Sequence, residues 1–536
     1  NIQHAVSAQE GNSLPVSAFK DYVDGTTPSG TAAYEKRGIA VDIPVWNQEN
    51  CIQCNRCAYV CPHAVIRPVA MTEAEVAAAP EGMKTLPMTG MADYKFAIVT
   101  SALDCTGCGS CVNVCPGKKG NKALTMANME ANEGEQKFFD YSVTLPVKED
   151  VVAKFKENTV KGSQFKQPLL EFSGACAGCG ETPYAKLITQ LFGDRMYVAN
   201  ATGCSSIWGN SSPSTPYTVN AKGQGPAWSN SLFEDNAEFG YGMLLAQKAL
   251  RDGLKTKVEA LIADTDKEDV KAAGQEWLDT FAVGATNGAA TDKLIAALEA
   301  CGCEKAQDIL KSKDFLAKKS QWIFGGDGWA YDIGFGGVDH VLASGQDINV
   351  MVFDTEVYSN TGGQASKSTQ PGAIAQFAAA GKEVKKKDMA SIAMSYGYVY
   401  VAQIAMGADY NQCVKAIAEA EAYPGPSLII AYAPCINHGI KKGMSKAQTE
   451  EELAVKTGYW HLFRFNPEAE NKFSLDSKAP DYTGYDEFLN GEVRYNSLKR
   501  ANPERAAKLF AKNQKCNEER YEYLNKLIAL HGAKAE

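Results

Sequence analysis

Long hydrophobic runs are missing from this sequence, and no uninterrupted apolar segment approaches the roughly 20 residues that a transmembrane helix needs. Basic charge is also in short supply, because 54 Lys and Arg face 63 Asp and Glu and the net charge is −9. Nucleic-acid-binding proteins are usually basic, so this balance argues against that class. No signal peptide opens the chain, and we expect a cytoplasmic protein that binds neither membrane nor nucleic acid.

The chain also lacks an initiator Met, since it begins Asn1-Ile2-Gln3, so we expect a trimmed protein or a piece of a longer one. Its 536 residues are too many for one ordinary domain. We expect a linker or the tail of a preceding domain at 1–38, a domain with two cysteine motifs at 39–149, and an α/β domain at 150–536. The last should hold a helical insertion at about 248–319 and a helical tail from Asn502 to Ala533.

The α/β expectation rests on short apolar runs separated by helical patterns, which indicate a parallel sheet covered by helices. Ligands of such sheets bind beyond the carboxyl ends of the strands. Chemically capable residues follow four of the runs, so we expect these residues to share one edge. The runs are Met196–Ala201 before Cys204, Gln321–Phe324 before Asp327, Ile348–Phe353 before Thr355, and Ser427–Tyr432 before Cys435.

Cysteine, in contrast, is plentiful, with 16 residues. In a chain of this size the spacing points to metal ligation in a reducing compartment and not to disulfides. Two copies of C-x2-C-x2-C-x3-C-P occur, which is the bacterial ferredoxin pattern for a pair of 4Fe–4S clusters. The alternative is zinc, but zinc sites usually take paired C-x2-C knuckles.

In the ferredoxin pattern, the fourth Cys of each motif ligates the other cluster. We therefore predict one α+β ferredoxin-like domain with two clusters of crossed ligation. The first cluster takes Cys51, Cys54, Cys57 and Cys115, and the second takes Cys61, Cys105, Cys108 and Cys111.

A third cysteine group is not a complete ligand motif in sequence. Cys176 and Cys179 form a single C-x2-C, which also fits a redox dithiol or half of a zinc site. Cys204 and Cys435 follow predicted strands, so the four together can form a third 4Fe–4S site, with ordinary buried cysteines as the alternative. The other four, Cys301, Cys303, Cys413 and Cys516, are interpreted as unligated, and only Cys301-Gly302-Cys303 invites attention.

An oxygen-rich motif suggests a diphosphate site. Gly326-Asp327-Gly328 follows a strand and opens a helix, and small residues there let the backbone approach a phosphate. We expect Asp327 to face solvent and to bind Mg²⁺, with the Thr355 hydroxyl and the Val357 carbonyl as further ligands. A glycine-rich loop, 359–364, would cover the cofactor. The alternative is a simple β–α turn.

These segments resemble the C-terminal half of the single-chain pyruvate:ferredoxin (or flavodoxin) oxidoreductases. The similarity runs from the first cysteine motif to near the chain end, and its most telling stretches are Gly174–Pro183, Ala201–Ser206, Ser231–Asp235 and the segments at Gly326 and Thr355. The resemblance implies that Cys176, Cys179, Cys204 and Cys435 hold the cluster nearest a thiamine diphosphate.

The resemblance also assigns the residues around the cofactor. Asp327, Thr355 and Val357 match the Mg²⁺ ligands, and Asn360 matches a residue near the substrate. One departure is Thr355, where the wider thiamine superfamily usually has Asn, although a hydroxyl can still ligate. The thiamine-binding positions are matched by Glu181, Cys204, Gly326, Asp327, Gly328, Trp329, Thr355, Glu356, Val357, Tyr358, Ser359 and Asn360.

As activity, the resemblance implies oxidation of pyruvate with coenzyme A to acetyl-CoA and CO2, with electrons leaving through three clusters to ferredoxin or flavodoxin. It further implies upstream domains or a companion subunit and a homodimer of the whole enzyme. The aminopyrimidine-binding domain and its activating Glu are not found here, so we expect an incomplete enzyme. The alternatives are a relative that acts on another 2-oxoacid, a pure electron-transfer subunit, and a non-redox thiamine decarboxylase, which would not need so many ligand-spaced cysteines.

Overall fold

The computed structural model describes residues 2–212 and 214–531. These fold as two compact units, each built from segments that are far apart in the sequence. Unit 1 comprises Asn1–Leu191, Gly203–Gly225 and Pro434–Glu450, and unit 2 comprises Phe192–Thr202, Pro226–Ala433 and Glu451–Glu536. The boundaries at 38 and 149 stay predictions. Among the described residues, none of the helices combines the length and the apolar character of a membrane span.

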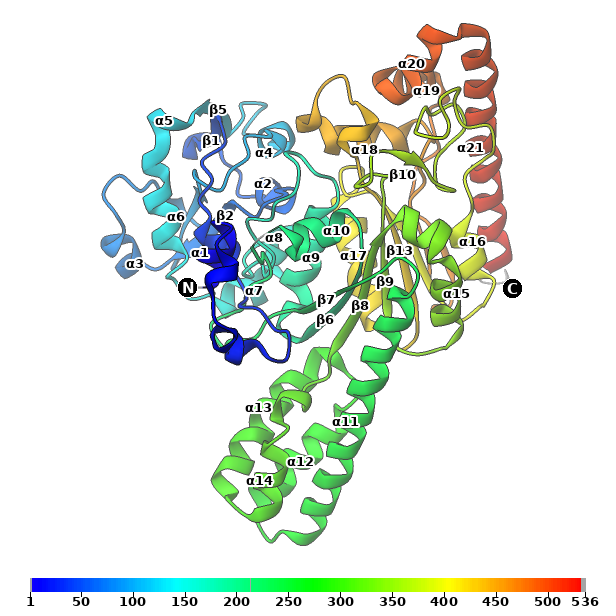
Figure 1. Cartoon of the computed structure of the whole chain (residues 1–536). Coiled ribbons are helices and arrows are strands. Elements are labelled where there is room, and N and C mark those ends of the chain that lie inside the picture. The colour runs from blue at the N-terminus through cyan, green and yellow to red at the C-terminus, as the bar shows by residue number, and fades with distance from the viewer. Residues whose placement is uncertain (1, 213, 532–536) are drawn as a thin grey trace. The chain divides into compact units, whose positions relative to one another are not determined.

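Unit 1 contains small antiparallel sheets and short helices (Figure 1). One sheet pairs β1 (Asp42–Trp46) with β5 (Leu124–Asn128), and the other has the order β2-β4-β3 (Ile66–Met71, Lys95–Thr100, Leu86–Pro87). A core of Ile43, Trp46, Phe96 and Leu124 joins them. Its α-helices include α1 (Ile2–Ser7), α2 (Arg56–Tyr59), α3 (Glu73–Ala78), α4 (Ser110–Val114), α5 (Met129–Asn132), α6 (Gln136–Ser142), α7 (Glu149–Phe155), α8 (Val160–Ser163), α9 (Thr182–Phe192) and α10 (Cys204–Ser206).

Unit 2 is organised by an eight-stranded sheet in the order β15-β14-β12-β13-β9-β8-β6-β7. All pairs from β12 to β7 are parallel, and only β14 and β15 run antiparallel at one edge. The strands span Phe473–Leu475, Phe463–Phe465, Tyr400–Ile404, Ser427–Tyr432, Asn349–Asp354, Ser320–Gly326, Met196–Ala201 and Ala227–Ser231.

This sheet confirms the predicted parallel architecture, and each of the four predicted strands is present. Every residue of β9 and β13 is buried, as expected of parallel strands with both faces covered. The second predicted strand is longer than expected, because β8 continues through Gly325 to Gly326. Asp327 and Thr355 are therefore the first residues after the neighbouring strands β8 and β9.

Helices cover the sheet. α15 (Phe335–Ala343), α16 (Met389–Met394), α17 (Tyr410–Ala422) and the C-terminal helices α19 (Tyr485–Gly491), α20 (Val493–Ala501) and α21 (Pro503–His531) belong to this unit. The predicted helical tail corresponds to α21, and its end at 532–533 lies outside the described residues.

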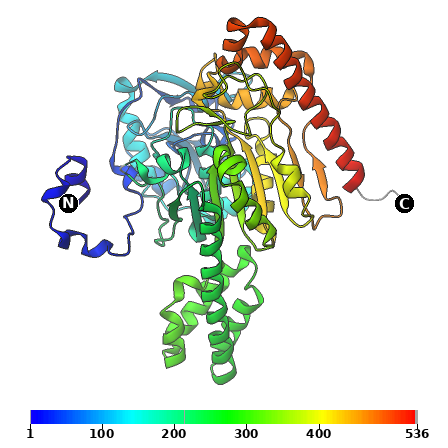
Figure 2. The ribbon, with the colours of Figure 1, turned by 45° about the vertical axis from the view of Figure 1, so that its right-hand side comes forward.

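The predicted insertion is a small helical bundle that projects from the sheet (Figures 1 and 2). It consists of α11 (Asn236–Asp264), α12 (Glu268–Asp279), α13 (Gly284–Cys301) and α14 (Glu304–Leu310). α11 starts on the sheet, where a Cβ at Gly240 would lie 2.6 Å from Ile323 Cγ1. α11 runs without a break through residue 248, where the insertion was expected to begin, so the bundle is continuous with the helix that packs on the sheet. A core of Leu254, Val258, Trp277, Leu294 and Leu298 holds the helices together.

Candidate cluster and diphosphate sites

In unit 1, the structure gathers the first predicted quartet of cysteines. Cys51, Cys54, Cys57 and Cys115 line one cavity together with Trp46 and Ile98. Burial, followed by the nearby Cys54, Cys51 and Cys115 sulfurs, raises the pKa of Cys57 well above its usual range. Cys115 of the second motif thus meets the first three thiols of the first motif at one place, as crossed ligation requires.

The second quartet shows the same grouping. Burial raises the pKa of Cys105 to about 12; the hydrogen bond from the Gly107 amide opposes this shift, and the nearby Cys61 and Cys108 sulfurs add to it. The pKa of Cys111 is raised by burial and by the sulfurs of Cys108 and Cys61. Cys61, although it belongs to the first motif, therefore lies with the second motif.

Local backbone geometry explains how each motif wraps its sulfurs. Gln53 (φ 55°) and Asn55 (φ 61°) are left-handed, and Gly107 and Gly109 occupy the equivalent positions of the second motif with φ of 69° and 77°. These turns direct the Gln53 and Gly107 amides at the Cys51 and Cys105 sulfurs, each at 3.4 Å. Such amides stabilise thiolates.

The strained residues of the first motif are held by side-chain bonds. Gln53 donates to the Pro87 carbonyl and accepts from the Thr89 amide, both at 2.9 Å. Asn55 donates to the Lys161 carbonyl at 3.0 Å. Because a left-handed conformation costs energy for a side chain larger than glycine, these bonds offset a strain that the second motif avoids.

The third quartet also lies within unit 1, although its members come from three separate segments. The Gly180 amide donates to the Pro434 carbonyl at 3.1 Å, which places the Cys176–Cys179 loop beside Cys435. Burial first, then Glu181, Cys179, Cys435 and Cys176 in that order, raise the pKa of Cys204. The Glu181 and Asn437 amides donate to the Cys179 and Cys435 sulfurs at 3.4 and 3.5 Å.

These thiols do not converge on a single point. In the part of the chain that the structure describes, no group of three or more His, Cys, Asp or Glu side chains is arranged to hold one metal ion. In a cubane each thiolate ligates a different iron, and the four sulfurs surround the cluster. The donor chemistry, with backbone amides directed at the sulfurs, fits that arrangement.

Glu181 lies next to the third quartet. Its side chain is buried, and the Trp208 indole Nε1 donates to its Oε2 at 2.8 Å. Burial raises the pKa of Glu181 to about 7. The structure thus supplies a carboxyl group that can be neutral or ionised near physiological pH.

In unit 2, the three expected Mg²⁺ ligands lie together. Asp327 Oδ1 accepts from the Thr355 hydroxyl at 3.0 Å and from the Thr355 amide at 3.2 Å. The same hydroxyl lies 3.0 Å from the Val357 carbonyl. One carboxylate, one hydroxyl and one carbonyl therefore meet at the carboxyl ends of β8 and β9, and such oxygens are the ligands that Mg²⁺ prefers.

Asp327 was expected to face solvent, and that expectation is wrong. The residue is fully buried, because Thr355 covers one carboxylate oxygen and the Ser366 hydroxyl donates to the other at 2.5 Å. Burial and then the Asp354 carboxylate raise the pKa of Asp327 well above its usual range. A cation bound here would favour the ionised carboxylate.

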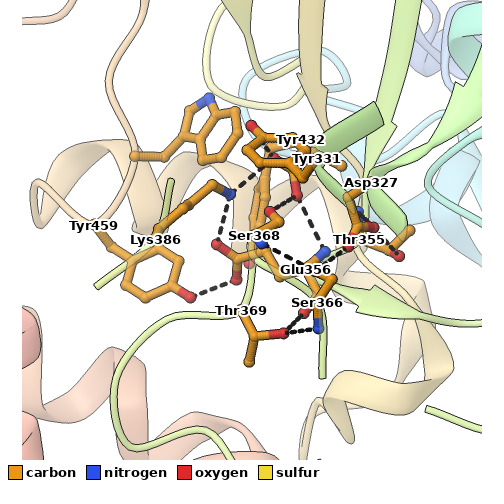
Figure 3. Close-up of polar contacts among 12 residues, drawn as sticks. Asp327, Tyr331, Thr355, Glu356, Ser366, Ser368, Thr369, Lys386, Tyr432 and Tyr459 are labelled. Atoms are coloured by element: carbon orange, nitrogen blue, oxygen red, sulfur yellow. Dashed lines mark hydrogen bonds and ion pairs between the residues drawn. The ribbon is translucent and has the colours of Figure 1, made fainter. Parts of the chain in front are cut away.

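A buried ionic network lies next to these oxygens (Figure 3). Lys386 Nζ is 2.7 Å from Asp354 Oδ2 and 3.1 Å from Glu356 Oε1. Arg494 contacts the other Glu356 oxygen at 2.9 Å, and the Tyr459 hydroxyl donates to it. The Glu356 carboxylate is thus fully engaged inside the protein. Its backbone is engaged as well, because the Glu356 amide donates to Asp354 Oδ1 at 3.1 Å and the Thr369 hydroxyl donates to the Glu356 carbonyl at 2.5 Å.

The network also fixes an unusual backbone. Glu356 has φ 59°, in the left-handed region, and stands between Thr355 and Val357. Strain of this kind persists only where the surroundings over-determine the conformation. Two cations and a tyrosine on one side chain do so here, and the strained turn presents the Thr355 hydroxyl and the Val357 carbonyl side by side.

The other expected cofactor residues surround this turn. Ser359 Oγ lies 2.6 Å from the Thr355 hydroxyl. Tyr358 is partly exposed, and Asn360 is exposed. Gly328 has to be small, because a Cβ there would lie 2.6 Å from the Tyr358 ring. Trp329 is completely buried, so its ring packs inside the unit. The loop 359–364 begins after β10 (Val357–Tyr358), which pairs with β11 (Gln364–Ala365).

Sequence reasoning missed the residues that hold this site. Asp354 reads as the polar end of a strand, and Lys386 is the middle of Lys385-Lys386-Lys387, a run that resembles a solvated surface. Arg494 lies more than a hundred positions away on α20. Nothing in the local pattern distinguishes these residues, because their pairing depends on the tertiary fold.

Three family models match the chain. Residues 50–119 match a 4Fe-4S double cluster binding domain, and residues 293–431 match the C-terminal TPP binding domain of thiamine pyrophosphate enzymes. Residues 1–40 match a domain of unknown function. The chain therefore carries an iron–sulfur domain and a thiamine diphosphate-binding domain, as predicted.

Long relatives match nearly the whole chain. It is 55% identical to a pyruvate-flavodoxin oxidoreductase of Enterobacter agglomerans, over 98% of this chain and 45% of the relative. A pyruvate-flavodoxin oxidoreductase of Klebsiella pneumoniae is 54% identical, over 96% and 44%. A pyruvate:ferredoxin oxidoreductase of Moorella thermoacetica is 55% identical, over 98% and 45%.

A solved structure is a more distant match. The 2-oxoglutarate:ferredoxin oxidoreductase from Magnetococcus marinus is 15% identical with a TM-score of 0.31, covering 61% of this chain and 91% of its own, a likeness too weak to bear on the site. The chain spans less than half the length of the curated relatives it matches. Over nearly its whole length it is similar to the C-terminal portion of the pyruvate-flavodoxin and pyruvate:ferredoxin oxidoreductases, and this confirms the resemblance that its motifs predicted.

Proposed function

We propose that this chain is the electron-transfer and diphosphate-binding part of an enzyme that oxidises pyruvate with coenzyme A to acetyl-CoA and CO2. The observation that carries the proposal is the meeting of Asp327, Thr355 and Val357 oxygens within the matched thiamine diphosphate-binding region. In the proposed enzyme, upstream domains or a companion subunit supply the rest of the active site, and the whole assembles as a homodimer. Its electron acceptor is ferredoxin or flavodoxin.

The oxygens of Asp327, Thr355 and Val357 would hold Mg²⁺, which commonly bridges protein carboxylates and substrate phosphates. Gly326 and Gly328 would let the backbone approach the diphosphate, and Trp329 would support it from inside the unit. Ser359 and the exposed Asn360 would face the cofactor and substrate. Thiamine diphosphate, when bound, supplies the carbanion stabilisation that decarboxylation of a 2-oxoacid needs.

The cysteines would hold three 4Fe–4S clusters. Cys176, Cys179, Cys204 and Cys435 form the proposed site nearest the thiamine, and the two ferredoxin quartets form the other two. Clusters carry single electrons, and a two-electron oxidation that ends on one-electron carriers must be divided into two transfers. The Gln53, Gly107 and Glu181 amides that point at sulfurs would stabilise the ligating thiolates and adjust the potentials.

The test is to assay the full-length protein without oxygen, with iron and sulfide analysis on the same sample. We expect about 12 Fe per chain, Mg²⁺-dependent binding of thiamine diphosphate, and reduction of ferredoxin or flavodoxin that requires both pyruvate and coenzyme A. Reduction with 2-oxoglutarate but not with pyruvate would identify another member of the 2-oxoacid class. Failure to bind thiamine diphosphate in an iron-replete sample would favour a pure electron-transfer subunit.

A further inference from the structure

We propose that Cys301 and Cys303 form a redox-active dithiol, a modification site that exchanges with small disulfides and closes into an intramolecular disulfide. The pair lies in the helical bundle of unit 2 and is separate from the cluster and diphosphate residues. The proposal does not depend on the proposed function.

The pair is brought together by a helix end. Cys301 is the last residue of α13, Gly302 follows with φ 63°, and Cys303 precedes the first residue of α14. The Gly302 amide donates to the Leu298 carbonyl at 3.2 Å, the bond of a left-handed helix cap. This reversal turns both side chains to the same side, and their sulfurs lie 2.8 Å apart.

The surroundings make the pair accessible and reactive. Both cysteines are partly exposed, and both pack on one side against the core of the bundle. The Cys303 thiol, the Cys303 backbone and the Lys267 ammonium lower the pKa of Cys301. Lys267 is held there by a 3.0 Å bond from its Nζ to the Cys301 carbonyl. A thiol with a lowered pKa and access to solvent is the kind that attacks disulfides.

The exchange balances as two thiol–disulfide steps. The Cys301 thiolate attacks one sulfur of glutathione disulfide, forming a mixed disulfide and releasing one glutathione thiolate, which takes up a proton. The Cys303 thiolate then attacks Cys301 Sγ, forms the Cys301–Cys303 bond and releases the second glutathione. The protein loses two electrons and two protons, and glutathione disulfide gains both.

A ring closed across one residue is strained, and strained or exposed disulfides are the easily reduced, labile ones. Reduced glutathione should therefore reopen this one. Cys516 provides an internal comparison, because it is also partly exposed but stands on α21 without a second cysteine next to it in sequence. Burial raises the pKa of Cys516, the opposite direction from Cys301.

The experiment uses the intact holoprotein, handled without oxygen and exposed to glutathione disulfide. The reaction is stopped with acid, free thiols are alkylated, and peptides are analysed by mass spectrometry. We expect the peptide with Cys301 and Cys303 to lose two hydrogens and to resist alkylation, at a rate at least about tenfold that of Cys516 modification. Later addition of reduced glutathione should restore both thiols.

Two variants separate the steps. Cys303→Ser should trap one glutathione on Cys301. In Cys301→Ser, glutathione disulfide should modify Cys303 no faster than it modifies Cys516. The double serine variant should keep its iron content and helical circular dichroism. If both cysteines remain alkylatable, or if Cys303→Ser is modified at the rate of Cys516, the dithiol assignment is wrong.

Discussion

The two units differ in the ligand atoms of their candidate sites and in how the fold positions those ligands. Unit 1 offers sulfur, mostly from contiguous motifs whose turns place the thiols locally. Unit 2 offers oxygen from the ends of two strands, braced by ion pairs to residues that are remote in sequence. Soft thiolates suit iron–sulfur clusters, and hard oxygens suit Mg²⁺. The contrast teaches that a motif can specify a site alone only where ligand placement is local.

The largest expected effect comes from the sulfur site whose four cysteines come from three separate segments of the chain. Cys435→Ser should remove the proposed third cluster, lowering iron from about 12 to about 8 per chain, and should abolish the proposed ferredoxin reduction while slow decarboxylation remains. Iron analysis and electron paramagnetic resonance of the full-length protein measure this. Cys516→Ser is the matched control and should change neither. Full iron and wild-type electron transfer in Cys435→Ser would remove Cys435 from the ligand set.

The next largest effect should follow from Lys386, which braces the oxygen site. Lys386→Met leaves the buried Asp354 and Glu356 carboxylates without a common cation, a change that costs about 3–5 kcal/mol in such pairs. Hydrogen exchange near the end of β9 should accelerate accordingly, and thiamine diphosphate binding should weaken. Lys386→Arg should restore part of both properties. The exposed neighbour Lys385→Met should behave as wild type; equal effects at both lysines would mean that the network has no positioning role.

Asp327 is a smaller and more specific test. Because the residue is buried, Asp327→Asn keeps its shape and removes the charge. Thiamine diphosphate affinity should fall at least about tenfold, equivalent to about 1.4 kcal/mol, with iron content unchanged. A mild chelator should likewise abolish diphosphate binding in the wild type, reversibly with Mg²⁺, and leave the thiolate-held iron in place. Asp339→Asn is the control carboxylate; unaltered affinity in Asp327→Asn would make Gly326-Asp327-Gly328 a structural turn.

The smallest effect concerns pH. His461 is buried in unit 2, and burial, followed by the Arg520 charge, lowers its pKa to about 3. In the unfolded chain His461 takes up a proton as the pH falls below about 6.5, whereas in the folded protein it stays neutral. The neutral histidine's contribution to stability is therefore complete above that pH and is lost as the pH falls. The expected slope is about 1.4 kcal/mol per pH unit below 6.5.

Hydrogen exchange of β14, compared between pH 6.5 and pH 5, measures this slope. His461→Gln should flatten it, whereas His340→Gln, at an exposed position, should not. An unchanged slope in His461→Gln would mean that the histidine is hydrated or already protonated in the folded protein.

Features that depend on residues close together in the sequence could be predicted, and features that depend on remote residues could not. The ferredoxin pairing, the parallel sheet and the strand ends at Asp327 and Thr355 were predictable, because spacing and hydrophobic periodicity act over short distances. The exposure of Asp327 was predicted wrongly, since a strand-end carboxylate gives no sign that Ser366 and Thr355 will cover it. The bracing by Lys386 and Arg494 was not predicted at all.

The sequence by itself therefore determined that the chain carries an iron–sulfur domain and a thiamine diphosphate-binding domain, because ligand type and short spacing are properties of adjacent residues. Only the tertiary structure decided how the ligands are held. Glu356 can keep its left-handed turn because Lys386, Arg494 and Tyr459, from three distant segments, surround one buried carboxylate. A buried charge has to find its partners in space, and nothing in its neighbours along the chain reveals them.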